Sequence, residues 1–247
     1  MRDTRILMGM PITVEIVGAQ NATTIDAVFE YLHLVDARFS TYKHNSEISA
    51  FNRGEVLPAN LSAEMKEVLQ WAAITRDQSK GYFEIRKPDG TLDPSGIVKG
   101  WAIRNAAKII AAAGFENFYV EAGGDVQCGG MNEEGCGWRV GIRSPFHDQE
   151  IIKVVTLKEQ GMATSGTYVR GQHIYNPHAP AETIEDIVSL SVIGPNILEA
   201  DRFATAAFAM GEKGIYFIEN LPGFEGYMVN AQGISTQTTG FGAYVLS

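Results

Sequence analysis

The hydrophobic pattern of the chain changes its period several times, and this constrains the fold more than any other feature. Outside residues 117–171, apolar residues recur every three or four positions in several segments, whereas within 117–171 short apolar segments are separated by Gly and Pro. The first spacing is typical of amphipathic helices and the second of strands joined by turns. The two kinds of segment do not alternate strictly, as parallel βαβ folds require. We therefore expect an α+β fold in which mixed or antiparallel sheets are flanked by helices.

The same pattern predicts where the elements lie. The clearest amphipathic helix has Thr23 or Thr24 as its N-cap and buries a stripe that ends at Phe39. Further helices are predicted after Ser62 and over 96–113, 195–210 and 215–218. Strands are predicted over 5–17, 118–120, 138–142, 151–157, 167–169 and 187–193, and near the C-terminus. No low-complexity stretch or Pro/Ser-rich linker divides the chain, so we expect residues 1–247 to form a single domain.

The acidic composition limits the ligands that the chain can bind. The 20 Lys and Arg residues against 29 Asp and Glu residues give a formal charge of −9. An acidic surface repels phosphate backbones, so we expect no nucleic-acid partner. A polyanionic ligand would have to be held by a metal ion, by a well-placed lysine or by backbone N–H groups.

We expect no membrane-spanning helix and no zinc site at the two cysteines. No run of 18 or more apolar residues occurs, as a spanning helix would need. The first residues lack a long apolar region and a lipid-attachment cysteine, which predicts a cytoplasmic protein. For Cys128 and Cys136 we expect two free thiols, with a lone disulfide as the alternative, because a zinc site would require more soft ligands.

Asp201 and Thr205 are the first candidates for chemistry. They lie four residues apart in a predicted helix, which places the carboxylate and the hydroxyl on one face. Two hard oxygens so placed suit Mg²⁺, which leaves its other positions to water and phosphate. The alternative is that Thr205 bonds back to the carbonyl of Asp201 while the carboxylate is solvated.

The segment 93–100 is the second candidate, because it opens a predicted helix. Gly96 permits close approach of the backbone, and the start of the helix presents free N–H groups to an anion. Lys99 adds a mobile positive charge, although the segment lacks the P-loop pattern. The alternative is an ordinary helix start with a lysine on the surface.

Three further segments carry weaker signals. Gly123 and Gly124 follow an apolar strand and precede Asp125, which indicates either backbone approached by a ligand or a tight turn. His173 is either a catalytic base or a structural histidine. Tyr42, just past the first helix, either stacks on a planar ring or packs against the protein.

Taken together in their order, these segments resemble the motifs of the ApbE family, the FAD:protein FMN transferases, across nearly the whole chain. The resemblance begins with Met-Gly at 8–9, Ser-x-Tyr at 40–42, Ser-Glu-Ile at 46–48 and Asn52. It continues with Asp-x-x-Gly-Ile-x-Lys-Gly at 93–100, Gly-Gly-Asp at 123–125, Ser-Gly-x-Tyr at 165–168, His-Ile-x-x-Pro at 173–177 and Asp-x-x-x-Thr at 201–205. Each motif is weak by itself, and the shared order makes the resemblance specific.

The resemblance implies an Mg²⁺-dependent enzyme that moves FMN from FAD to a Ser or Thr hydroxyl of a target flavoprotein and releases AMP. It implies that the carbonyl of Gly96, Asp201 and Thr205 hold the metal. His173 is our candidate for the general base, with Asp201 as the rival. It also implies cofactor-binding roles for Met8, Tyr42, Glu84, Asp93, Lys99, Gly123, Gly124, Asp125, Ser165 and His173.

Departures from the family pattern leave alternatives open. Glu84 stands where many relatives have Asp, and Asn176 stands where a carboxylate is commoner. One alternative is an Mg²⁺-dependent FAD pyrophosphatase, in which water replaces the target hydroxyl. Another is a non-catalytic FAD-binding protein, although such a protein has little need for the metal pair. The aromatic residue at Tyr42 resembles the transferases and favours transfer over hydrolysis.

Overall fold

The structure is a computed structural model that describes residues 1–147, 150–166 and 174–246. The helices are α1 (Thr23–Phe39), α2 (Glu47–Asn52), α3 (Ala63–Gln78), α4 (Ser95–Ala112), α5 (Ile197–Ala209) and α6 (Gly214–Glu219). The strands are β1 (Arg2–Leu7), β2 (Met10–Ile16), β3 (Phe118–Ala122), β4 (Asp125–Gly129), β5 (Trp138–Arg143), β6 (Ile151–Leu157), β7 (Gly161–Gly166), β8 (Ile187–Gly194), β9 (Glu225–Asn230) and β10 (Ser235–Gln237). Short 3₁₀ turns lie at Pro58–Asn60, Gly211–Lys213 and Phe241–Tyr244.

Two antiparallel sheets form the framework of the molecule. The larger has eight strands in the order β1-β2-β3-β4-β7-β8-β9-β10, and β5 and β6 form a separate hairpin. Every strand pair in the described part of the chain is antiparallel. The expected α+β class with antiparallel sheets flanked by helices is therefore confirmed.

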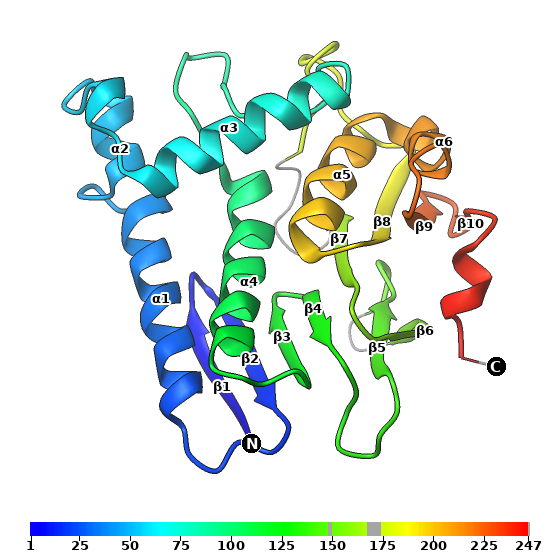
Figure 1. Cartoon of the computed structure of the whole chain (residues 1–247). Coiled ribbons are helices and arrows are strands. Elements are labelled where there is room, and N and C mark those ends of the chain that lie inside the picture. The colour runs from blue at the N-terminus through cyan, green and yellow to red at the C-terminus, as the bar shows by residue number, and fades with distance from the viewer. Residues whose placement is uncertain (148–149, 167–173, 247) are drawn as a thin grey trace.

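The large sheet is covered on both faces. Helices α1, α4, α5 and α6 pack along one face and enclose the larger apolar core (Figure 1). The β5–β6 hairpin and the turn at Phe241–Tyr244 cover part of the other face and enclose a second, smaller core. Because β4 lies between both cores, all five of its residues are buried. The sandwich thus fixes the ends of β3, β4 and β7 relative to α4 and α5.

The predicted helices and strands agree with the structure where the spacing of apolar residues was regular. The predicted apolar stripe of the first helix is buried in α1 and consists of Ile25, Val28, Phe29, Leu32, Val35 and Phe39. Ser62 caps α3 by accepting a hydrogen bond from the Met65 N–H. The predicted cap of α1 is wrong, because the cap position is Ala22 and no side chain bonds there. The predicted strand 167–169 lies outside the described residues.

The expectation of one strand over 5–17 is also wrong. The segment is a hairpin, in which Leu7 pairs with Met10 across a two-residue turn. Both turn residues have positive φ, 54° at Met8 and 74° at Gly9, as a type I′ hairpin turn requires. Apolar alternation continues through the turn, so the period alone did not reveal the break.

The remaining sequence expectations concern the thiols and the membrane. Cys128, which is buried, and Cys136, which is exposed, are both free. Among the described residues, no helix combines the length and apolar character that crossing a membrane requires.

Candidate active site

The centre of the candidate site is the point where α4 crosses α5. The Gly100 N–H donates a 2.7 Å hydrogen bond to Oδ2 of Asp201. A Cβ atom on Gly100 would lie 2.6 Å from the Asp201 Cβ and 2.8 Å from the Ile197 carbonyl oxygen. Real Cβ atoms do not approach so closely, so the absence of a side chain at residue 100 lets the two helices meet.

One turn further along the same crossing, Thr205 meets Gly96. The Thr205 hydroxyl donates to the Gly96 carbonyl oxygen at 3.3 Å. The hydroxyl therefore bonds across to α4 rather than back to Asp201. Asp201 is only 4% exposed, so its carboxylate is buried and not solvated as the alternative required. The structure thus brings together the three groups that the sequence analysis predicted as metal ligands.

The electrostatics of this crossing are unusual. Burial, together with the neighbouring carboxylate of Asp125, raises the pKa of Asp201 to about 7, against the opposing effects of Lys99 and the Gly100 N–H. Asp125 is 1% exposed, and its Oδ2 lies 2.7 Å from the Lys99 ammonium. Two buried carboxylates therefore share one ammonium group. Lys99 is engaged with Asp125, whereas the sequence analysis expected a mobile positive charge or, as the alternative, a lysine on the surface.

We predict that Gly100→Ala destabilises the protein by about 1–3 kcal/mol, because the added methyl overpacks the helix crossing. Urea unfolding measures the change. Gly242→Ala is the matched control, since nothing lies within 4 Å of the Cβ position there. Equal unfolding midpoints for the two variants would contradict the close packing at residue 100.

A cavity of about 290 Å³ opens beside this crossing. The wall comes from the β1–β2 and β3–β4 turns, the loop before α4, β5, β7 and the segment 174–177. Among the predicted site residues, those that line the cavity are Met8, Glu84, Asp93, Gly96, Lys99, Gly123, Gly124, Ser165, Asp201 and Thr205. The sequence analysis thus identified ten of the residues that line the cavity.

Three predicted residues are placed differently. Asp125 is buried and does not line the cavity, but it contacts two residues that do, Lys99 through an ion pair and Thr164 through a hydrogen bond from its N–H. Tyr42 is 98% exposed and does not line the cavity, so its role in stacking stays a prediction. His173 lies outside the described residues, although the following residue, Ile174, lines the cavity.

The turn between β3 and β4 contributes backbone to the cavity wall. Gly123 and Gly124 have φ values of 60° and 97°, which side chains rarely adopt. The Gly124 N–H donates a 2.6 Å hydrogen bond to the Glu121 carboxylate, whose pKa burial raises. The sequence left two alternatives for this segment, a tight turn or backbone open to a ligand. The structure combines them, because the tight turn also brings bare backbone to the cavity.

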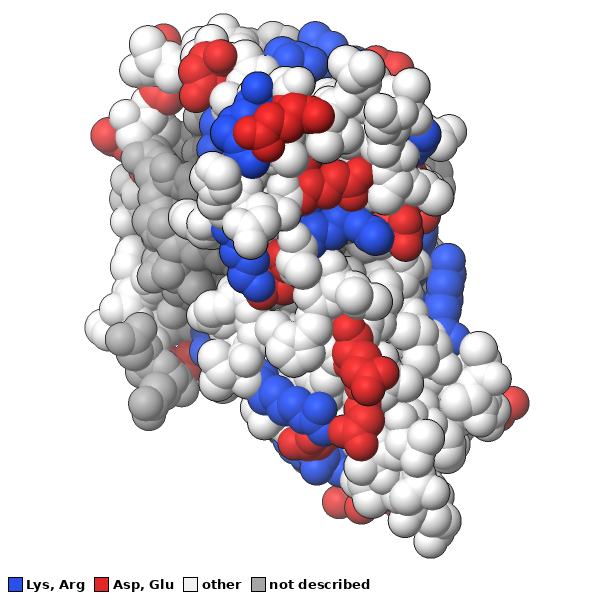
Figure 2. Space-filling model, turned by 90° about the vertical axis from the view of Figure 1, so that its left-hand side faces the viewer, with Lys and Arg blue, Asp and Glu red and all other residues white. Residues whose placement is uncertain are grey.

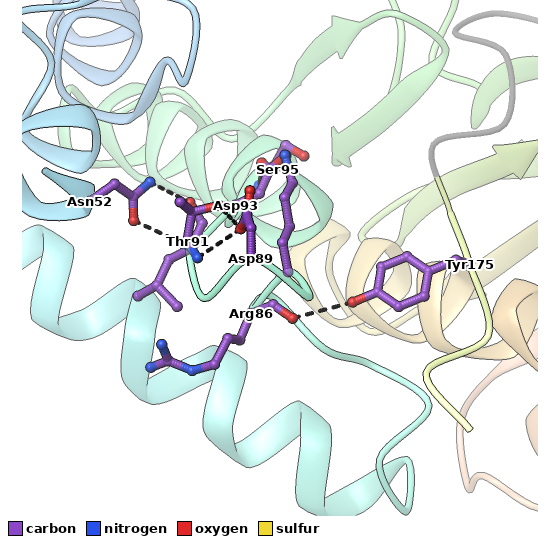
Figure 3. Close-up of polar contacts among 9 residues, drawn as sticks. Asn52, Arg86, Asp89, Thr91, Asp93, Ser95 and Tyr175 are labelled. Atoms are coloured by element: carbon purple, nitrogen blue, oxygen red, sulfur yellow. Dashed lines mark hydrogen bonds and ion pairs between the residues drawn. The ribbon is translucent and has the colours of Figure 1, made fainter. Parts of the chain in front are cut away.

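Asp93 is held in place by the loop before α4 (Figure 3). Its Oδ2 lies 2.8 Å from the Lys87 ammonium, and its Oδ1 accepts a hydrogen bond from the Ser95 N–H. Burial raises the pKa of Asp93, but these partners outweigh burial and lower the pKa overall. Asp93 is therefore an ionised carboxylate that accepts a hydrogen bond from the first backbone N–H of α4.

Asn52, at the end of α2, fixes this loop from the other side. Its amide donates to the Leu92 carbonyl at 2.9 Å and accepts from the Leu92 N–H at 2.8 Å (Figure 3). Leu92 directly precedes Asp93. The Asn residue of the family pattern is thus a clamp on the cavity wall, a role that the sequence did not reveal.

We predict that Asn52→Ala weakens FAD binding about tenfold, because both hydrogen bonds to Leu92 are lost and the loop before α4 is released. Titration of flavin fluorescence measures the affinity. Asn220→Ala serves as the control, since Asn220 bonds only to the Tyr216 carbonyl on the surface. An unchanged affinity in Asn52→Ala would show that the clamp does not position the cavity wall.

Several cavity residues were missed by the sequence analysis. They are mainly aromatic, basic or small: Tyr82, Phe83, Lys87, Gly141, Arg143, Thr164, Ile174 and Tyr175. The Tyr175 hydroxyl donates to the Arg86 carbonyl at 3.3 Å and so links the segment 174–177 to the loop before α4 (Figure 3). Ile174 belongs to the His-Ile-x-x-Pro motif, but no motif specifies the others, because they enter the cavity through the packing of distant segments.

The donor set at the crossing fits a hard divalent cation. It combines a backbone carbonyl, a hydroxyl and a buried carboxylate that lies beside a second carboxylate. Mg²⁺ binds through few protein oxygens of this kind and keeps positions for water and phosphate. In the described ranges, no cluster of three or more His, Cys, Asp or Glu side chains suited to a metal occurs.

Comparison with known proteins gives consistent matches. The model of the ApbE family matches residues 8–87 and 84–228. The FAD:protein FMN transferase of Escherichia coli K12 is 29% identical over 182 residues, which are 70% of this chain and 52% of that protein. The corresponding Haemophilus influenzae protein is 25% identical over 79% of this chain and 75% of its own length. The matched region thus spans about half the length of the E. coli relative.

Solved structures share the fold. The flavin transferase ApbE from Vibrio cholerae superposes with a TM-score of 0.85 at 22% identity, covering 99% of this chain and 98% of its own. The ApbE protein from Thermotoga maritima gives 0.86 at 20% identity, covering 100% and 99%. Since the family model covers most of the sequence and the fold agrees throughout, the chain belongs to the ApbE family.

Proposed function

We propose that this protein is an Mg²⁺-dependent FAD:protein FMN transferase. The observation that carries the proposal is the meeting of the Gly96 carbonyl, the Asp201 carboxylate and the Thr205 hydroxyl on the floor of the cavity. A protein with a formal charge of −9 holds a dinucleotide pyrophosphate most readily through an added cation. The activity named for the relatives supports the same assignment.

Asp201, Thr205 and the Gly96 carbonyl would hold the cation. When bound, Mg²⁺ neutralises the charge of the pyrophosphate and so reduces its repulsion of an incoming nucleophile. Lys99 keeps the buried Asp125 charge balanced beside this site. The turn at Gly123 and Gly124 and the N-terminus of α4 present backbone to the rest of FAD.

The transfer step requires a base and an acceptor hydroxyl. The hydroxyl oxygen of a Ser or Thr in the target protein attacks the phosphorus on the FMN side. A phosphoester bond forms, the P–O–P bond breaks, and AMP leaves with the electron pair. We propose that His173 accepts the hydroxyl proton, because an imidazole is mostly neutral at pH 7 and Asp201 is committed to the cation.

Two assays test the proposed function. Mass spectrometry of flavoproteins co-expressed with this chain should detect covalently added FMN on a Ser or Thr. Purified protein with FAD and Mg²⁺ should then release AMP rapidly only when the acceptor is present. Rapid formation of free FMN and AMP without acceptor would identify a pyrophosphatase, and tight FAD binding without AMP under any condition would identify a carrier.

Three expectations from the sequence stay predictions alongside this proposal. They are the contact between Tyr42 and a planar ring, the single domain over residues 1–247 and the cytoplasmic location.

A further inference from the structure

Two arginines differ from all others in the described part of the chain. The side chains of Arg139 and Arg143 make no hydrogen bond and no ion pair there, and only their backbones pair with β6. Arg86 donates to the Gly90 carbonyl, and each remaining described arginine pairs with Asp or Glu. Arg143 exerts only a longer-range influence, since its charge lowers the pKa of Glu121 against the effect of burial. Both guanidinium groups are therefore available to an external anion.

The two arginines lie on one face of one strand. Along β5, buried and exposed residues alternate, and the exposed ones are Arg139, Gly141 and Arg143. Gly141 and Arg143 line the cavity, whereas Arg139 lies beyond its lining. At 3.3 Å per residue, the two arginine positions are roughly 13 Å apart. The exposed face of β5 thus leads from the cavity wall outward over a length that suits an extended polypeptide.

The surroundings of this face resemble a protein-binding surface. Ile151, the partner of Arg143 in β6, is 47% exposed, and Phe146 in the following loop is 49% exposed. Arginine and large apolar side chains are enriched in protein interfaces. By contrast, on the face that carries α1 and α2, basic and acidic side chains lie side by side (Figure 2). Arg5, for example, has Asp3 as a partner at 2.8 Å.

We propose that the exposed face of β5 is the docking surface for the acceptor polypeptide, and that the acceptor presents acidic side chains to Arg139 and Arg143. The proposal rests on the proposed transferase function, because it requires a polypeptide substrate. Arginine forms bidentate hydrogen bonds with carboxylates, which would fix the register of the segment. Gly141, between the arginines, lines the cavity, and a Cβ atom there would lie only 3.0 Å from Cδ1 of Ile151. The docked segment would therefore rest on the Ile151 side chain between the two guanidinium groups.

Two synthetic peptide libraries test the proposal. Each peptide carries one threonine and is otherwise random, except that aspartates flank the threonine in one library and lysines flank it in the other. The wild-type protein, FAD and Mg²⁺ are incubated with each library, and mass spectrometry counts the FMN-labelled peptides. We expect about tenfold more labelling of the aspartate library, as charge complementarity at an interface allows.

Arg139→Gln is the decisive variant, because Arg139 does not line the cavity. We expect it to lose most of the preference for aspartate while its affinity for FAD, measured by flavin fluorescence, stays unchanged. Arg143→Gln should also lose the preference. Lys108→Gln is the charge-matched control, since Lys108 is exposed on α4 roughly 18 Å along the helix from Gly96. The control should keep the wild-type preference.

The outcomes distinguish a failure of the docking surface from a failure of the proposed transferase function. Equal labelling of both libraries by the wild-type protein, or an unchanged preference in Arg139→Gln, would overturn the docking surface and leave the transferase function intact. A loss of FAD affinity in Arg139→Gln would also overturn it, because the residue would then act on FAD. If neither library is labelled and no AMP forms, the proposed function itself is contradicted.

Discussion

Asp201→Asn should lower Mg²⁺-dependent FMN transfer by about a thousandfold or more, because the loss of a metal ligand removes several kcal/mol of charge neutralisation at the pyrophosphate. Asparagine keeps an oxygen that can accept the hydrogen bond from the Gly100 N–H, so the helix crossing is preserved. AMP release at saturating FAD measures the effect. Activity within tenfold of the wild type would contradict the assignment of Asp201 as a ligand.

Asp201→Asn, which lowers activity, should raise the stability of the metal-free protein at neutral and higher pH. Since burial raises the pKa of Asp201 to about 7, the folded protein retains a proton that the unfolded chain has already lost. Without metal, the wild type therefore loses stability as the pH rises from the ordinary carboxyl range to about 7. Asp201→Asn removes this loss and should melt at a higher temperature than the wild type above that pH. Mg²⁺ should raise the melting temperature of the wild type but not of the variant.

Thr205→Val is expected to lower transfer about a hundredfold, because valine keeps the shape of threonine and removes one oxygen ligand of the cation. Thr205→Ser is the matched control, since it retains the hydroxyl that bonds to the Gly96 carbonyl. The Mg²⁺ concentration that gives half-maximal activity should rise in Thr205→Val and change little in Thr205→Ser. Equal losses in both variants would contradict a specific role of the hydroxyl, because Thr205→Ser retains it.

The sequence predicted the helices that build the site, because their apolar stripes are uninterrupted. The prediction for 96–113 agrees with α4, and that for 195–210 agrees with α5. The spacing of Asp201 and Thr205 then placed both groups on one helix face, and the crossing in the structure confirms their proximity to Gly96. Local periodicity was sufficient here because four residues of helix determine the relative position of two side chains.

Other features depend on contacts between distant segments and left no local signal. The turn at Met8 and Gly9 lies within a continuous alternation of apolar residues, so it was read as part of a strand. The link between Asn52 and Leu92 joins residues 40 positions apart. Arg143 is the last residue of β5, one position beyond the predicted strand 138–142, and whether the exposed face of this strand meets a cavity depends on how the β5–β6 hairpin packs on the large sheet.

The most direct test of the metal site is a crystal structure of the protein soaked with FAD and Mn²⁺, which substitutes for Mg²⁺ and gives an anomalous signal. The account predicts one strong anomalous peak bonded to Asp201, Thr205 and the Gly96 carbonyl, with pyrophosphate oxygens of FAD completing its coordination. A peak elsewhere in the cavity, or FAD bound with no peak at the crossing of α4 and α5, would contradict it.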